Sequence, residues 1–174
     1  MKKKYIISIG ILFILLSCGA KKPKNFTLLY DGKDTGLETL IMTEGCYYDP
    51  SDGAMITFYK DGISIYQRSS KSLIDFLKWM EKGGIDRFKG KSWGYGRYII
   101  SGAVIINQRV EHTFTDGSFM SERKYRIIDE THIQNLDNNA ILEFYPLEDR
   151  VDSTNWLLKK KWFWTKEAWD NRNK

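Results

Sequence analysis

The sequence predicts a mainly β fold, an antiparallel up-and-down meander that closes into a β-barrel with one inserted short helix and a Trp-rich C-terminal segment. First, residues 93–136 consist of strand-like runs separated by short turns, which is typical of a β-meander. Second, aromatic residues, which favour strands, occupy 25 of the 174 positions, whereas proline occurs only three times. Third, about eight such runs occur along the chain, the number whose closed interior holds side chains or one small ligand.

The N-terminal residues predict the cellular compartment. Three lysines at positions 2–4 precede an apolar stretch of 11 residues, 6–16, which is shorter than the ~20 residues needed to span a bilayer. The stretch leads into Leu15-Leu16-Ser17-Cys18, which resembles the lipobox of bacterial lipoproteins. The resemblance implies that residues 1–17 are a signal peptide and that the thiol of Cys18 carries a diacylglycerol anchor. The alternative is an ordinary secretory signal that happens to contain a cysteine.

The chain that follows the signal peptide is long enough for one domain. Removal of 17 of the 174 residues leaves 157 and takes away three lysines, which lowers the formal net charge from +5 to +2. The basic composition is therefore no argument for nucleic-acid binding, and we expect none. We expect residues 18–25 to be a lipid-anchored tether and residues 26–174 a single barrel domain. The tether has no acidic run after Cys18, which favours an outer-membrane anchor that faces the periplasm.

The first half of the domain predicts two extended segments followed by a tight hairpin. Residues 26–30 form a short strand or an extended lead-in, and a strand covers residues 41–48. The acidic residues 49–53 form a turn, because the remainder of a calcium-binding loop pattern is missing. Residues 54–59 and 63–68 form a hairpin, because the Asp-Gly pair between them supplies the positive φ of a tight turn.

A helix interrupts the meander at residues 72–82. Apolar residues recur there at helical spacing, Ser70 or Ser72 can cap the helix, and Gly83-Gly84 can end it. Two placements follow from the pattern: a plug or lid at one end of the barrel, or an outer helix that packs its apolar stripe on the sheet.

The longest strand is expected at residues 103–114, where apolar and polar residues alternate. Val104, Ile106 and Val110 occupy even positions, so the period-two rule predicts that the even face points into the barrel. Further strands are expected at residues 119–128, 132–136 and 140–145.

Polar residues on the expected interior faces are candidate ligand contacts. Gln108 and His112 share the even face of the long strand, and Arg123 shares the parity of Tyr125 on the next strand. Unpaired polar groups inside a filled barrel cost free energy, whereas a ligand-binding barrel places a few among aromatic residues. We therefore predict that Gln108, His112, Arg123 and Tyr125 contact a ligand. The alternative is that they lie at the barrel mouth or that a bulge reverses the parity.

The C-terminal region changes in character. A short helix is expected at residues 153–161, and four of the six tryptophans follow one another within the last nineteen residues, at positions 156, 162, 164 and 169. So much indole surface predicts that this segment docks on the domain.

No residue pattern indicates catalysis or a cofactor. The letters of a hydrolase triad at positions 112, 116 and 118 lack a nucleophile-elbow motif, and neither a phosphate loop nor metal-ligand spacing is present. We therefore expect no enzymatic activity, no cofactor and no metal. If Cys18 is lipidated, Cys46 is the one free thiol that remains, and we expect it to be a small buried apolar residue.

Four short motifs in order resemble the lipocalin-like lipoproteins of Bacteroidetes-type bacteria. These are the sequences at residues 45–48, 58–62, 93–98 and 125–129. The resemblance covers roughly residues 26–145 and implies a lipid-anchored calycin-like barrel without catalytic residues. Our first hypothesis is an envelope lipoprotein whose barrel binds a small, partly apolar ligand. The second is an envelope interaction or scaffold protein that uses its outer face or Trp-rich tail and has a filled barrel.

Overall fold

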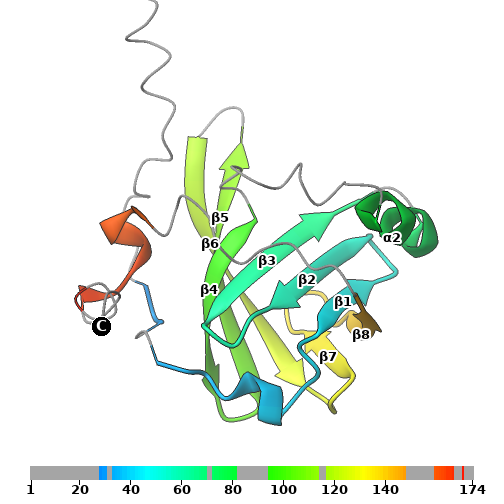
Figure 1. Cartoon of the computed structure of the whole chain (residues 1–174), viewed down its shortest axis with the longest axis horizontal. Helices are drawn as coiled ribbons and strands as arrows, with labels where there is room; N and C mark the ends of the chain where they lie inside the picture. The colour runs from blue at the N-terminus through cyan, green and yellow to red at the C-terminus, as the bar shows by residue number, and fades with distance from the viewer. Residues whose placement is uncertain are drawn as a thin grey trace, which may run out of the picture.

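The computed structural model shows a closed barrel of eight antiparallel strands, in which neighbours in sequence pair and β8 pairs back to β1 (Figure 1). The predicted fold class, an up-and-down barrel with one inserted short helix, is confirmed. The structure describes residues 28–30, 33–69, 72–81, 94–113, 117–147, 159–166 and 170, without the side chains of residues 79–81, 112, 113, 117 and 118.

The strands are short on one side of the barrel and long on the other. The two longest, β5 and β6, pair along ten residues. The strands are β1 (Gly45–Asp49), β2 (Ala54–Phe58), β3 (Ile63–Arg68), β4 (Tyr95–Ser101), β5 (Val104–Thr113), β6 (Gly117–Ile127), β7 (His132–Asn135) and β8 (Ile141–Pro146).

One end of the barrel is closed by the chain that precedes β1. The 3-10 helix η1 (Leu37–Thr39) places its first residue among the interior side chains, and Ile41 joins it there. The hydroxyl of Tyr47, which points inward from β1, donates to the carbonyls of Met42 and Glu130 at 3.0 and 2.9 Å. This network ties the closing segment to the β6–β7 turn.

Apolar side chains fill the interior beside the closed end. Phe58 is central, with its ring 5.1 Å from that of Tyr98 and 6.2 Å from that of Tyr125, both edge-on. The strand residues of this interior cluster are Tyr47, Ile56, Phe58, Tyr98, Ile105, Tyr125, Ile133, Leu142 and Phe144.

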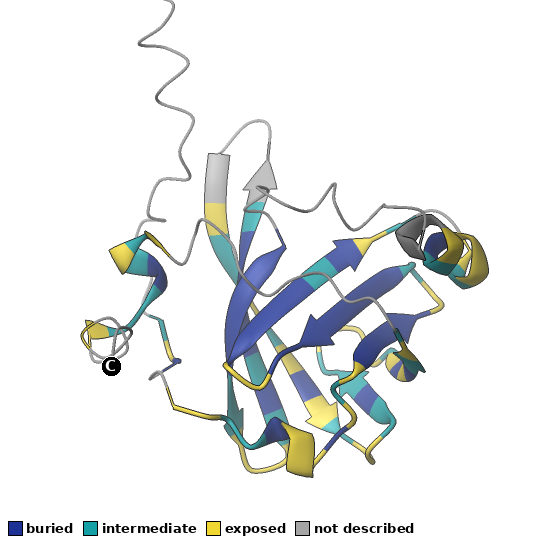
Figure 2. Cartoon of the chain, viewed as in Figure 1, coloured by how far each residue is buried: buried dark blue, intermediate teal, exposed yellow. Residues whose placement is uncertain are grey.

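The outer wall is covered as well, because β1 and β2 are buried at every residue (Figure 2). A second cluster lies on this outer face and joins the barrel to the inserted helix and the C-terminal segment. Cys46 belongs to it and is fully buried, which confirms the expectation for this thiol. Burial raises the pKa of Cys46 to about 12.

The inserted helix α2 (Leu73–Glu81) is the one predicted at residues 72–82. Its start is capped as expected, because the backbone N–H of Asp75 donates to Ser72 Oγ at 3.2 Å. Phe76 is buried in the outer cluster, so α2 packs on the outside of the sheet rather than inside the barrel. Among the described residues, no helix is long and apolar enough to cross a membrane.

The described part of the C-terminal segment docks on the barrel wall, as predicted. Phe163, in the 3-10 helix η4 (Lys161–Phe163), is 1% exposed and belongs to the outer cluster, with Trp162 and Trp164 packed beside it. The expected helix at residues 153–161 and the tryptophans at positions 156 and 169 fall largely outside the described residues.

Two boundaries differ from those expected. The first strand begins at Gly45 rather than at residue 41, because the preceding residues turn back over the barrel end as η1. Of the expected strand at residues 26–30, the described part, residues 28–30, is extended chain without strand pairing. The hairpin of β2 and β3 forms as predicted, with Gly62 at φ 77°.

Candidate ligand-binding site

The end of the barrel opposite η1, which is the open end as far as the described residues go, contains a cavity of about 340 Å³. It lies beyond the apolar interior, among the inward-facing ends of the strands and the turns that join β1 to β2 and β7 to β8. The volume is at the lower end of the ~300–1,000 Å³ range of small-molecule pockets. The lining residues are Asp49, Asp52, Ala54, Tyr66, Arg68, Arg109, Glu111, Arg123, Tyr125, Asn135, Asp137, Asn138 and Leu142.

Arg109 is the buried cation of this cavity. It points inward from β5, opposite Gly96 of β4, where an added Cβ would lie 2.9 Å from the Cβ of Arg109. A Cβ at position 96 would crowd the Cβ of Arg109, so glycine at this position leaves room for the arginine side chain. The guanidinium carbon stacks 3.5 Å from the ring centroid of Tyr66, and Nε donates to Glu111 Oε1 at 2.7 Å.

One terminal nitrogen of the Arg109 guanidinium is not satisfied. The residue is 4% exposed, and its Nη1 is buried without a hydrogen-bond partner among the described residues. A buried donor without a partner costs about 1–3 kcal/mol. Arg109 thus brings a buried guanidinium to the cavity wall, with one donor atom that has no partner among the described residues.

Glu111 is held in its ionised form beside this arginine. Burial opposes its ionisation, but Arg109, the hydroxyl of Ser121 and Arg123 outweigh that effect and hold the pKa of Glu111 below its usual value. The Ser121 hydroxyl donates to Glu111 Oε1 at 2.8 Å. Glu111 therefore positions Nε of Arg109 and leaves the Nη groups to the cavity.

Tyr125 forms the floor between the polar cavity and the apolar interior. Its side chain is 2% exposed, and burial raises its pKa to about 12, so the phenol is a neutral donor. Tyr66, Arg109 and Arg123 line the same cavity as Tyr125.

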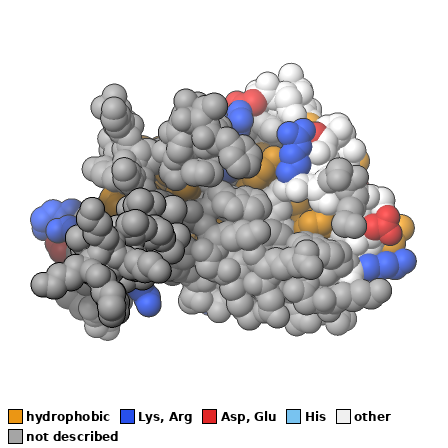
Figure 3. Space-filling view, turned by 90° about the horizontal axis from the view of Figure 1, so that it is seen from above, with side chains coloured by type: hydrophobic (Ala, Val, Ile, Leu, Met, Phe, Trp, Pro, Cys, Tyr) orange, Lys and Arg blue, Asp and Glu red, His pale blue; other side chains and the backbone are white. Residues whose placement is uncertain are grey.

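Ion pairs surround the mouth. Arg123 Nη1 lies 2.7 Å from Asp137 Oδ2, with both side chains about two-fifths exposed, at 41% and 43%. Arg68 Nη2 lies 3.1 Å from Asp52 Oδ2. Charges of both signs also lie next to one another on the described part of the face seen from above (Figure 3). Exposed pairs of this kind are weak, so an incoming ligand can displace them.

The predicted inner face of the long strand is wrong. The odd residues of β5, including Ile105, Asn107 and Arg109, point into the barrel, and the even residues point outward. The physical reason is that the outer face of β5 is covered, so that Val110 is fully buried in the cluster that contains Phe163. The inner face is polar because it lines the cavity. Alternation showed two faces correctly but could not show which of them is enclosed.

The four candidate ligand contacts therefore do not all lie in the cavity. Arg123 and Tyr125 line the cavity together. Gln108 lies on the outer face, where its Oε1 accepts from the backbone N–H of Leu29 at 2.8 Å and its Nε2 donates to Glu122 at 3.3 Å. The side chain of His112 and the lipidation candidate Cys18 lie outside the described residues.

Sequence reasoning missed Arg109, Glu111 and Tyr66. The available signal was the parity shared by Asn107, Arg109 and Glu111, a polar series on one face of a strand that has to close a barrel. From the sequence alone this polar face is expected to point toward solvent, because polar residues usually face water.

No model of a known protein family, no curated protein and no solved structure matches this chain. The interpretation of the cavity therefore depends on its own geometry. Among the described residues, no group of three or more His, Cys, Asp or Glu side chains is arranged to hold a metal ion. What the described cavity offers is a set of donors and acceptors above an aromatic floor.

Proposed function

We propose that this protein is a lipid-anchored lipoprotein of the cell envelope whose barrel binds a small molecule at its open end. The observation that carries the proposal is Arg109, a buried residue that lines the cavity and whose Nη1 has no hydrogen-bond partner among the described residues. Buried polar groups in folded proteins almost always have partners, and the exceptions often mark a binding site. A bound ligand supplies the missing acceptor.

The size and lining of the cavity restrict the ligand. At roughly 30 Å³ for each water-sized group, the cavity holds about ten non-hydrogen atoms. The lining offers polar groups of arginine, tyrosine and asparagine side chains, together with apolar surface from Leu142 and the rings of Tyr66 and Tyr125. A small molecule with a polar head and a short apolar part fits this lining.

The proposal is tested by filling the cavity. Ala54, a 7% exposed lining residue, is replaced in Ala54→Trp, and the matched control Ile141→Trp adds the same indole on the outer face of β8. The purified full chain in detergent is screened by saturation-transfer NMR against mixtures of organic acids, their amides, amino acids and monosaccharides. We expect the wild type and Ile141→Trp to bind the same compounds and Ala54→Trp to bind none.

Equal binding by Ala54→Trp would show that the compounds bind elsewhere. The proposal would be overturned if the wild type binds no compound in the mixtures and mass spectrometry detects no small molecule released when the protein is denatured. Circular dichroism of each variant checks that the barrel is intact.

The alternative, an interaction protein that uses its Trp-rich tail, has less support. Phe163 and Trp164 pack against Arg97 on the barrel wall, with the guanidinium carbon 5.1 and 4.3 Å from their ring centroids. These aromatic side chains are therefore occupied within the chain, which favours a structural role for this part of the tail.

A further inference from the structure

We infer that the ligand of the open-end cavity is a small carboxylate, whose oxygens are bound by the Nη groups of Arg109 and by Arg123. This inference rests on the proposed function and specifies the chemical class of its ligand. The inference depends on a comparison of the polar groups in the cavity that already have hydrogen-bond or ion-pair partners with those that do not.

The acidic groups of the cavity all have donors within the chain. Asp52 is paired with Arg68, and Asp137 with Arg123. Glu111 accepts from Arg109 and Ser121, as described above. Asp49, which is 2% exposed, accepts from the backbone N–H of Ser51 at 2.8 Å. A cationic ligand would therefore compete with partners that are already in place.

The one buried side-chain atom of this lining without a partner, among the described residues, is a donor, Nη1 of Arg109. Nε is engaged by Glu111, and Tyr66 covers one face of the guanidinium plane. What remains is the Nη edge, which presents two parallel N–H directions. That edge matches the two oxygens of a carboxylate, and a charge-assisted pair is roughly twice as strong as a neutral hydrogen bond.

A second cation lies next to this edge. Register pairs Arg109 of β5 with Ser121 of β6, and Asn107 with Arg123, so the two arginines are diagonal neighbours on the inner face. Arg123 is held by one exposed ion pair to Asp137, which a ligand carboxylate can replace at little cost. Tyr125 lines the same cavity as both arginines, so its neutral hydroxyl is a third donor for the same group.

The test uses matched probes of similar size. Hexanoate, 3-phenylpropanoate and N-acetylleucine are each compared with the corresponding primary amide, by NMR titration of the full chain in detergent at pH 7. We expect at least one acid to bind about tenfold or more tightly than its amide, because only the acid forms charge-assisted bonds with arginine.

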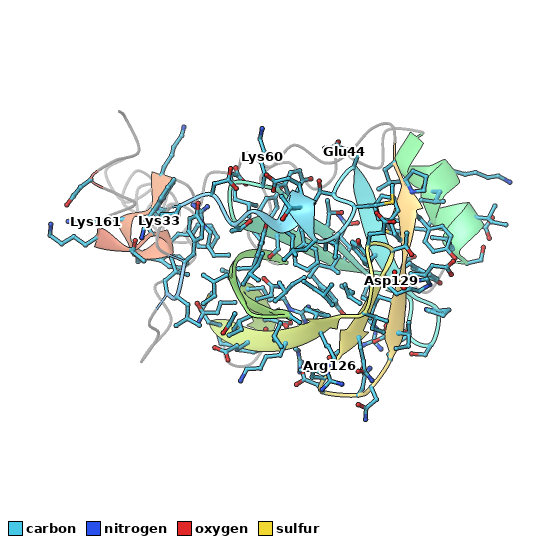
Figure 4. All side chains as sticks on the ribbon, turned by 90° about the horizontal axis from the view of Figure 1, so that it is seen from below. Lys33, Glu44, Lys60, Arg126, Asp129 and Lys161 are labelled. Atoms are coloured by element: carbon cyan, nitrogen blue, oxygen red, sulfur yellow. The ribbon has the colours of Figure 1, made fainter. Side chains whose placement is uncertain are left out.

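Two substitutions are expected to change the affinity for the acid in opposite directions. Arg109→Gln weakens binding of the acid about tenfold or more, because the charge-assisted pair is lost. Glu111→Gln keeps an acceptor oxygen for Arg109 and Ser121 but removes a negative charge, so the acid binds about fivefold more tightly. The control Arg126→Gln, on the outside of β6, leaves the affinity unchanged (Figure 4).

Arg123→Gln keeps the inference testable if Arg109→Gln fails to fold. Arg123 is partly exposed at the mouth, and its replacement is expected to weaken acid binding several-fold without loss of the barrel.

The outcomes separate this inference from the proposed function. If amides bind as tightly as acids, or Glu111→Gln weakens acid binding, the carboxylate inference is wrong. If no acid binds, but neutral compounds bind and lose binding in Ala54→Trp, the inference is wrong and the proposed function stands. If the wild type binds neither class, both fail.

Discussion

Arg97 shows how a single residue joins the tail to the barrel. It is 2% exposed on the outer face of β4, and its guanidinium carbon lies 4.8 Å from the ring centroid of Tyr30, in addition to its contacts with Phe163 and Trp164. Burial lowers its pKa to about 10, so it is still charged at neutral pH. The three rings replace water as the environment of this cation.

Removal of this side chain is expected to destabilise the fold. Arg97→Ala leaves a cavity between β4 and the aromatic rings and should lower the free energy of unfolding by about 2–4 kcal/mol, the range for large-to-small buried substitutions. The measurement is urea unfolding followed by tryptophan fluorescence. The exposed Arg126→Ala is the control and should change stability by less than about 0.5 kcal/mol. Equal effects of the two substitutions would mean that Arg97 contributes no packing.

Single residues also show where sequence reasoning reached its limit. Arg123 and Tyr125 were placed correctly on an inner face, because polar and aromatic residues share a parity there. Gln108 was placed on the wrong face, because its strand is covered on both sides. The difference depends on Leu29 and Phe163, which are remote from β5 in sequence and approach it only in the folded chain.

At the scale of elements, local signals predicted the elements that local chemistry determines. The β2–β3 hairpin follows from an Asp-Gly turn, and α2 follows from Ser72 and the helical spacing of its apolar residues. The 3-10 helix η1 was missed, because Leu37 is fully buried only through its insertion into the end of a closed barrel. When tertiary contacts determine the conformation of an element, its local sequence gives little indication of that conformation.

The turn between β6 and β7 is expected to make stability depend on acid pH. Asp129 accepts from the backbone N–H of Thr131 at 2.8 Å and lies 2.9 Å from Nδ1 of His132, and these contacts lower its pKa from 3.8 to about 2 (Figure 4). A carboxylate whose pKa is lower in the folded state stabilises the fold above the unfolded value. That stabilisation is lost as the pH falls from about 4 to about 2.

Melting temperatures measured between pH 5 and pH 2 test this turn. Asp129→Asn keeps an acceptor oxygen but does not titrate, so its melting temperature should fall less over this interval than that of the wild type. Glu38→Gln, an exposed substitution in η1, is the control and should follow the wild-type profile. Parallel profiles for Asp129→Asn and the wild type would contradict the prediction.

At the scale of the whole molecule, the barrel divides into two halves with different roles. The closed half is packed with aromatic and aliphatic side chains around Phe58, which supplies the stability. The open half gives up apolar packing for a charged cavity. The strand count and connection lengths predicted the closed barrel. They could not predict this division, because it depends on which side chains meet across the interior.

The proposed lipid anchor is the last prediction at the scale of the whole molecule, because it would determine where the cavity operates. In the proposed lipoprotein, two or three acyl chains on Cys18 would contribute ~0.8 kcal/mol for each buried CH₂ group and would hold the protein firmly on a membrane. We expect the chain produced in bacteria to fractionate with membranes and to show the mass of a lipidated N-terminal cysteine. Cys18→Ser should shift it to the soluble fraction, with the mass of an unmodified chain. Cys46→Ser is the matched control and should stay in the membrane fraction. A Cys18→Ser protein that remained membrane-bound would show that another part of the chain provides the attachment.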